Sequence, residues 1–190
     1  MNFLAHLYLA ADCGESLIGS VLGDFVKGRL RGQYSADIER AIRSHRLIDS
    51  FSDSHPVTRR SRQRVSAQRR RFAGVMVDLC YDHFLACHWR RFHDQDLANF
   101  VSAAYRRLST PGPDLPDQAR RVIQAMISRD WLGSYQQVNQ IGVALDRIAG
   151  RVRSGEKFLG ALDEIRHHYA ALETDFLEFF PALIDHNRRQ

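Results

Sequence analysis

The sequence has few of the residues that mark several protein classes. Its three cysteines include no Cys-x-x-Cys pair, which excludes a disulfide framework. Cys80 and Cys87 lie within an apolar helical pattern, so we expect both to pack in the core, in a reducing compartment. No apolar run reaches the roughly 20 residues that a membrane span needs, and the apolar start lacks the basic residues of a signal peptide. We therefore expect a cytoplasmic protein with no membrane partner.

Lysine is also scarce. Lys27 and Lys157 are the only two, so the net charge of +5 and the pI near 9.4 are due to arginine. Arginine binds carboxylates and phosphates through a planar fork of N–H donors. The composition therefore indicates an anionic partner, which at this level is either a nucleic acid or an acidic protein.

Alternating β-branched runs are missing, and apolar residues recur with helical spacing over most of the chain. The pattern predicts helices at residues 2–11, 36–51, 72–92, 96–108, 120–129, 135–148 and 158–180, with another starting at Pro56 and the last ending at Pro181. We expect one all-α domain over residues 1–190, a bundle of about seven or eight helices. Residues 1–93 would supply most of the metal and active site, and residues 114–190 the supporting helices.

One stretch, residues 42–56, reads I-R-S-H-R-L-I-D-S-F-S-D-S-H-P. His45, Asp49 and Asp53 are four residues apart and share one face of a helix, with His55 just beyond. Their neighbours are apolar or small, which favours an inward orientation. Buried charges are costly unless they are paired or bound to metal. The alternative is a solvated helix with His–Asp pairs four residues apart.

Further carboxylates and histidines lie in apolar surroundings. Asp78 and Asp82 share a helix face, with His83 about 100° round the axis from Asp82. Asp82 and His83 together indicate a metal or catalytic role. The alternative is that His83 is an ordinary histidine of the core. Asp24 lies in apolar company and is either a helix-end acceptor or a functional ligand. His6 lies near the middle of the first predicted helix.

Arginines are concentrated after Pro56. Residues 59–71 include Arg59, Arg60, Arg62, Arg64, Arg69, Arg70 and Arg71. Such a segment cannot be a core helix. It is either an ordinary solvated face or a surface on which an anion docks.

Histidine and carboxylate clusters without cysteine favour Mn²⁺, Mg²⁺ or Fe²⁺ over structural zinc. Such a metal lowers the pKa of bound water and neutralises charge on a phosphoryl oxygen. No P-loop, dinucleotide fingerprint or nucleophile elbow is present in the sequence. The residues therefore indicate metal-assisted hydrolysis of a phosphoester.

Four motifs carry a resemblance to a known family: M-N-F-L-A-H-L-Y-L-A, G-D-F-V-K-G, H-R-L-I-D-S-F-S-D-S-H-P and D-L-C-Y-D-H-F-L-A-C-H-W. The sequence resembles the bacterial acyl carrier protein phosphodiesterases, most closely over residues 1–93. The resemblance implies a Mn²⁺-dependent enzyme that removes the 4′-phosphopantetheine arm from the serine of holo-acyl carrier protein. It also implies a distant relationship to the helical HD phosphohydrolases.

The resemblance also implies roles for individual residues. Asp24 matches a position tied to activity in the family, as a metal ligand or water-orienting carboxylate. His45 and Asp49 would be further ligands, and Asp82-His83 superficially repeats an HD pair. A remaining group would supply a ligand, a general acid or a supporting contact: His6, Asp53, His55 and Asp78. Lys27 or an arginine would stabilise the phosphoryl oxygens, and the arginine segment 59–71 would dock the acidic carrier protein.

Two other functions remain open from the sequence. One is an HD-type nucleotide or cyclic-nucleotide phosphohydrolase, which keeps the metal and changes the substrate. The other is a helical nucleic-acid binder, which leaves the inward carboxylate–histidine clusters unexplained and lacks a helix-turn-helix signature. We expect no nucleic-acid partner, and the sequence does not indicate an oligomeric state.

Overall fold

The computed structural model describes residues 1–110, 114–150 and 155–190, and every regular element in these ranges is a helix, which confirms the all-α prediction. Nine of the α-helices in these ranges have seven residues or more. The α-helices are α1 (Phe3–Asp12), α2 (Leu17–Leu22), α3 (Ala36–Ser54), α4 (Pro56–Arg64), α5 (Ala73–Cys87), α6 (Trp89–Phe92), α7 (Leu97–Ser109), α8 (Asp117–Ser128), α9 (Trp131–Ser134), α10 (Val138–Ala149), α11 (Ala161–His167) and α12 (Tyr169–Arg188). Two 3₁₀ helices, η1 (Ala67–Phe72) and η2 (Gly155–Phe158), complete the set.

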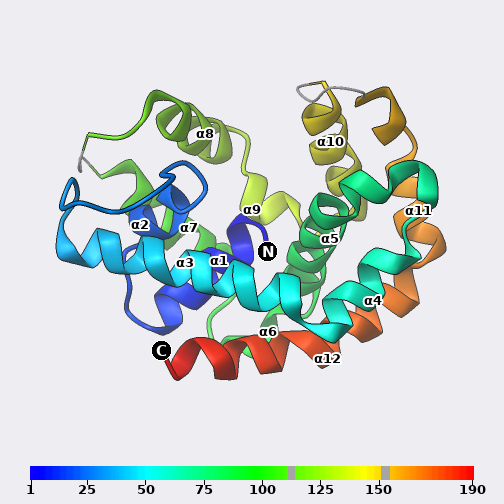
Figure 1. Cartoon of the computed structure of the whole chain (residues 1–190), viewed down its shortest axis with the longest axis horizontal. Coiled ribbons are helices and arrows are strands. Elements are labelled where there is room, and N and C mark those ends of the chain that lie inside the picture. The colour runs from blue at the N-terminus through cyan, green and yellow to red at the C-terminus, as the bar shows by residue number, and fades with distance from the viewer. Residues whose placement is uncertain (111–113, 151–154) are drawn as a thin grey trace.

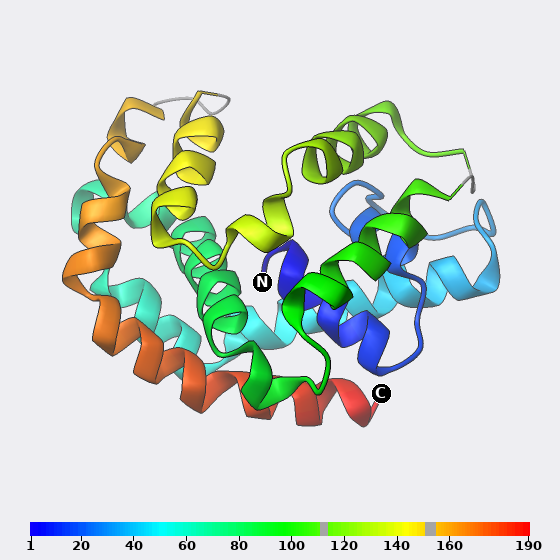
Figure 2. The same cartoon turned by 180° about the vertical axis from the view of Figure 1, so that it is seen from behind.

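The helices surround the start of the chain. Figures 1 and 2 show α8 and α10 on either side of the N-terminus, with α12 along the opposite edge of the molecule. Helix α3 packs on α2 and α4, and α12 packs on α4 and α5. No helix in the described ranges combines the length and apolar character required to cross a membrane.

Helix α1 lies at the centre of this arrangement. Every residue from Leu4 to Ala10 is buried, and the helix contacts α2, α3 and α5. A helix that is apolar on all sides is stable only when other elements cover it completely. His6 therefore lies in the interior, with 2% of its surface exposed.

The C-terminal region differs from the prediction. In place of one helix that stops at Pro181, the chain forms α11 and then α12, which continues through Pro181 to Arg188. Proline removes one backbone hydrogen bond from a helix. Contacts with α1 and the turn after it stabilise the last turns, because Asn187 Nδ2 donates to the Leu9 carbonyl at 3.1 Å and Arg188 pairs with Asp12 at 2.8 Å.

The cysteines divide between core and surface. Cys80 is buried, as expected, whereas Cys87 is exposed at the end of α5. The prediction that Cys87 packs in the core is therefore wrong.

A buried carboxylate joins α12 to α4. Asp175 accepts hydrogen bonds from Ser61 Oγ at 2.7 Å, Arg60 Nε at 2.8 Å and Arg64 Nε at 3.0 Å. Its side chain is only 2% exposed. Burial alone would raise the pKa of Asp175, but the bonds from Arg64, Ser61 and Arg60 lower it below the ordinary value.

The contacts of Asp175 should make the folding stability of the protein depend on pH. Because the pKa of Asp175 is lower in the folded state, its charge contributes stability above the ordinary aspartate pKa, and that contribution is lost as the pH falls through the folded value. We expect Asp175→Asn to be less stable than the wild type at pH 7 and to lose less stability on further acidification. Urea unfolding at several pH values between 7 and 3 measures both effects. Parallel pH profiles for the two proteins would contradict this role.

Candidate metal centre

Two buried histidines and a partly exposed aspartate from two helices meet beside α1. His6 comes from α1, and His45 and Asp49 come from α3. His6 Nε2 lies 3.0 Å from Asp49 Oδ1, and His45 Nε2 lies 3.2 Å from Asp49 Oδ2. The two imidazole rings stack with their centroids 3.7 Å apart. Asp49 thus contacts both histidines, one through each carboxylate oxygen.

The end of α2 closes one side of this cluster. Gly23, the C-cap of α2, lies so close to His45 that a Cβ on it would be 2.2 Å from Cγ of the ring. Only glycine permits this approach. Asp24 follows directly, with Oδ1 at 3.6 Å from His45 Nε2 and its side chain 46% exposed. The cluster is therefore open to solvent on the side of Asp24.

The carboxylates strongly favour a positive charge here. Burial alone would raise the pKa values of Asp49 and Asp24, but the histidines beside them lower both below the ordinary range. Burial opposes the charge of His45, yet the neighbouring carboxylates of Asp24 and Asp49 raise its pKa. The pKa of His6 is lowered by burial and by the neighbouring charge of His45. The carboxylates therefore favour a positive charge at His45, while burial disfavours one at His6.

A further carboxylate, Asp78 of α5, lies beside the cluster. The Met1 amino group lies between Asp49 Oδ1, at 3.3 Å, and Asp78 Oδ1, at 3.5 Å. Burial opposes the charge of this amine, but Asp78 and Asp49 raise its pKa. The pKa of Asp78 is itself raised, chiefly by burial. A cationic group already occupies the space between these two carboxylates.

The donor set fits a divalent cation. Ligand atoms from His6, His45 and Asp49 all lie within 4.8 Å of one another. The separations of 3.0 and 3.2 Å from the Asp49 oxygens to the two histidines suit atoms that share an ion at about 2.0–2.2 Å. His6 Nδ1 and both ring nitrogens of His45 are buried and make no well-formed hydrogen bond. Two imidazoles and a carboxylate suit a transition metal such as Mn²⁺ or Fe²⁺ better than Mg²⁺, which prefers oxygen ligands.

The structure does not bring Asp82 and His83 into this group, contrary to the ligand set that the sequence suggested. Both Asp82 oxygens accept backbone N–H groups at the start of α1, from Leu4 at 2.8 Å and Ala5 at 3.0 Å. His83 lies elsewhere, with Nδ1 at 2.7 Å from the Tyr135 carbonyl and Nε2 at 2.8 Å from the Tyr169 hydroxyl. Asp82 therefore caps a buried helix, and His83 joins α5 to α12.

Three other candidates lie outside the ligand trio. Asp53 is one turn beyond Asp49 and pairs with Arg62 at 2.5 Å, its side chain 64% exposed. His55 Nδ1 accepts the Val57 N–H at 3.3 Å and so caps α4. Lys27 is exposed in the segment after α2.

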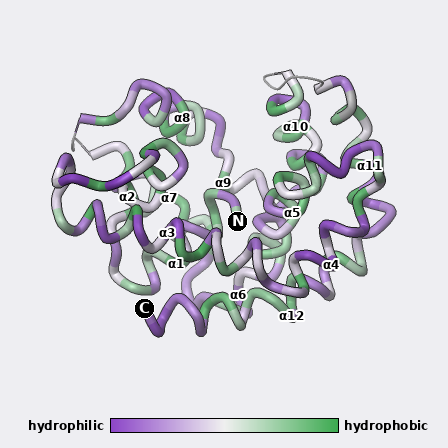
Figure 3. Tube along the Cα trace, in the orientation of Figure 1, coloured by the Kyte–Doolittle hydropathy of each residue, from purple (hydrophilic) through white to green (hydrophobic). Residues whose placement is uncertain are grey.

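The arginines of residues 59–71 are largely engaged within the protein. Arg60 and Arg64 bond to Asp175, and Arg69 pairs with Glu164 at 2.9 Å. Figure 3 shows the hydrophilic character of α4 and of the segment that follows it. Arg59 and Arg70 are exposed, and among the described residues neither forms an ion pair. Arg71 is exposed as well, over the ring of Phe72. These three arginines are best placed to meet a partner.

Sequence reasoning missed two features near the centre. One is the need for glycine at position 23, where a Cβ would collide with the ring of His45. The Gly23-Asp24 dipeptide was the only hint of it in the sequence. The other is a cavity with walls from α1, α5, α8, α9 and α10. Its residues are scattered from Asn2 to Ile148, so no local pattern could have identified it.

Comparison with known proteins identifies related sequences. The family described as acyl carrier protein phosphodiesterase has a sequence model that matches residues 1–183. Relatives named acyl carrier protein phosphodiesterase include those of Pectobacterium atrosepticum, 32% identical, Escherichia coli O157:H7, 35% identical, and Yersinia pestis, 34% identical. Each match covers 97% of this chain and 96% of the relative. No solved structure matches the chain significantly.

Proposed function

Because the chain belongs to the acyl carrier protein phosphodiesterase family, we propose that it hydrolyses the phosphodiester between 4′-phosphopantetheine and the serine of holo-acyl carrier protein. The observation that carries the proposal is the cluster of His6, His45 and Asp49, which brings two imidazoles and a carboxylate together in a member of a phosphodiesterase family. The products would be apo-acyl carrier protein and free 4′-phosphopantetheine.

We further propose that His6, His45 and Asp49 hold one divalent cation, with Mn²⁺ as the first choice. When bound, such an ion lowers the pKa of its water ligand and neutralises charge on the phosphoryl oxygens. The stacked imidazoles and the two-sided contact of Asp49 support the assignment, because they fix the three donors before the ion arrives.

The chain's own carboxylates would move the protons. Asp24 faces solvent beside His45 and stays ionised, so it can accept a proton from the attacking water. Asp78 lies on the other side of Asp49, across the Met1 amine, and burial raises its pKa above the ordinary aspartate value. Asp78 is therefore our candidate for the general acid that protonates the departing serine oxygen.

A direct assay tests the proposal. Purified holo-acyl carrier protein is incubated with the enzyme and Mn²⁺, and intact mass spectrometry follows conversion to the apo form. We expect loss of the arm, inhibition by EDTA and recovery on addition of Mn²⁺. A panel of nucleotides and cyclic nucleotides serves as the comparison. An unchanged carrier protein together with turnover of a nucleotide would reject the proposed substrate in favour of the general phosphohydrolase reading.

The docking role of the arginines gives a separate prediction. We expect Arg59→Glu to raise KM for the carrier protein at low salt, and the effect to shrink at high salt, because exposed charges act through screened long-range attraction. Arg59 is preferable to Arg60 or Arg64, because replacing either of these would also remove one of the partners of the buried Asp175. Arg189→Glu, an exposed change at the far end of α12, is the matched control. Equal KM values for the two variants would exclude docking at Arg59.

A further inference from the structure

A cavity of about 220 Å³ begins at the N-terminal end of α1, the helix that carries His6. Asn2 and Phe3 form part of its wall, and His6 is one turn further along α1. Leu79 of α5 forms another part and directly follows Asp78. The cavity and the metal centre therefore use successive turns of α1, and Asp78, which lies beside the centre, is the sequence neighbour of Leu79 in the cavity wall.

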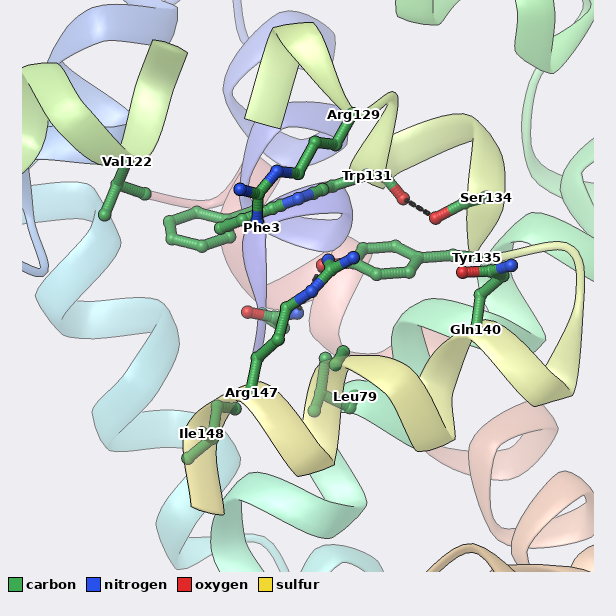
Figure 4. Close-up of a pocket in the computed structure, with 12 residues that line it drawn as sticks. Phe3, Leu79, Val122, Arg129, Trp131, Ser134, Tyr135, Gln140, Arg147 and Ile148 are labelled. Atoms are coloured by element: carbon green, nitrogen blue, oxygen red, sulfur yellow. Dashed lines mark hydrogen bonds between the residues drawn. The ribbon is translucent and has the colours of Figure 1, made fainter. Parts of the chain in front are cut away.

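The walls are apolar and aromatic. Phe3, Trp131 and Tyr135 face this space, and Leu79, Val122 and Ile148 add aliphatic surface (Figure 4). Such walls favour a ligand with methyl and methylene groups, because contact removes apolar surface from water.

The polar groups of the cavity are mostly donors. Arg129, in the link before α9, and Arg147 of α10 extend toward the space from opposite sides (Figure 4). Among the described residues neither arginine forms an ion pair, and none of the twelve residues that line the cavity is acidic. A ligand that satisfies these groups must carry acceptors such as carbonyl oxygens.

We propose that this cavity binds the pantetheine arm of the substrate, an inference that rests on the proposed function. The arm leaves with the phosphate, so it must extend away from the phosphorus, and the cavity begins one helical turn from His6. Its geminal methyl groups match the aromatic walls, and its two amide carbonyls match the donors of Arg129 and Arg147. The volume lies below the roughly 300–1,000 Å³ of sites for drug-sized ligands, as suits one limb of a substrate.

Pantetheine without its phosphate is the probe, because its binding does not depend on the metal. The wild type should show a saturable change in tryptophan fluorescence, because Trp131 lines the cavity. Ala144→Phe places a ring on the cavity wall and should abolish the change. Val143→Phe introduces the same ring at the neighbouring exposed position of α10 and is the matched control.

Turnover provides the second readout. Ala144→Phe and Arg147→Met should lower kcat/KM for holo-acyl carrier protein by about tenfold or more, the ratio that corresponds to about 1.4 kcal/mol of lost binding. Mn²⁺ binding and the melting temperature should match those of Val143→Phe. This comparison separates a blocked cavity from a damaged fold.

The two proposals fail in different ways. A wild type that hydrolyses the carrier protein but gives no saturable response to pantetheine would overturn the cavity assignment and leave the proposed function intact. An Ala144→Phe variant equal to the wild type in both assays would overturn it as well. Failure of the proposed function would instead appear as a wild type that releases no phosphopantetheine.

Discussion

Asp49→Asn is expected to reduce phosphopantetheine release by more than about 100-fold, since even outer partners of metal ligands are worth about 10–100-fold. The carboxylate of Asp49 contacts His6 and His45 through separate oxygens. Asparagine keeps the size of the side chain but removes the charge and one acceptor. The same variant should bind Mn²⁺ much more weakly, which calorimetric titration measures independently of turnover.

A control on the same helix makes this result specific. Asp37 lies in the first turn of α3, is exposed and pairs with Arg40 at 2.7 Å. Asp37→Asn should leave both activity and Mn²⁺ affinity unchanged. An Asp49→Asn protein that binds Mn²⁺ as tightly as the wild type would contradict the proposed ligand set.

The second large effect is expected on stability, from Asp82→Ala. This change leaves the buried N–H groups of Leu4 and Ala5 without acceptors, at about 1–3 kcal/mol each. Burial raises the pKa of Asp82 to about 7, while the two backbone bonds lower it. Removing the carboxylate therefore also relieves a burial penalty, so we expect the lower half of the resulting range of about 2–6 kcal/mol. Urea unfolding at pH 7 measures the loss.

Two variants calibrate this value. Asp82→Asn keeps one acceptor oxygen and should lie between the wild type and Asp82→Ala. Asp94→Ala removes an exposed carboxylate and should have no effect. If Asp82→Asn retained full stability but lost Mn²⁺ binding, Asp82 would be a metal ligand, as the sequence suggested, and not the cap of α1.

Spacing along the chain was informative wherever one helix sets the geometry. The four-residue interval between His45 and Asp49 correctly placed both side chains on one face of α3. The same interval between Asp78 and Asp82 was less informative, because the two carboxylates have different partners. Asp78 lies beside the Met1 amine, whereas Asp82 accepts two N–H groups of α1. A pattern within one helix cannot show which neighbour covers each turn.

The arginine segment illustrates the same limit. A dense run of like charge indicates a surface, yet Arg60 and Arg64 bond to Asp175, 115 and 111 residues away in sequence. The relationship to HD phosphohydrolases, the identity of the metal and the carrier-protein docking surface remain predictions.

Composition and periodicity were sufficient for the helical class and for His45 and Asp49 as neighbours, because a helix repeats with a constant geometry. The motifs also indicated the family, which the comparisons confirm. Only the packing of separate helices decided three other features: the contact of His6 with α3, the capping of α1 by Asp82 and the cavity at Trp131. Those contacts depend on side-chain shape and on the need of every buried N–H for an acceptor, and both are satisfied between segments far apart in the chain.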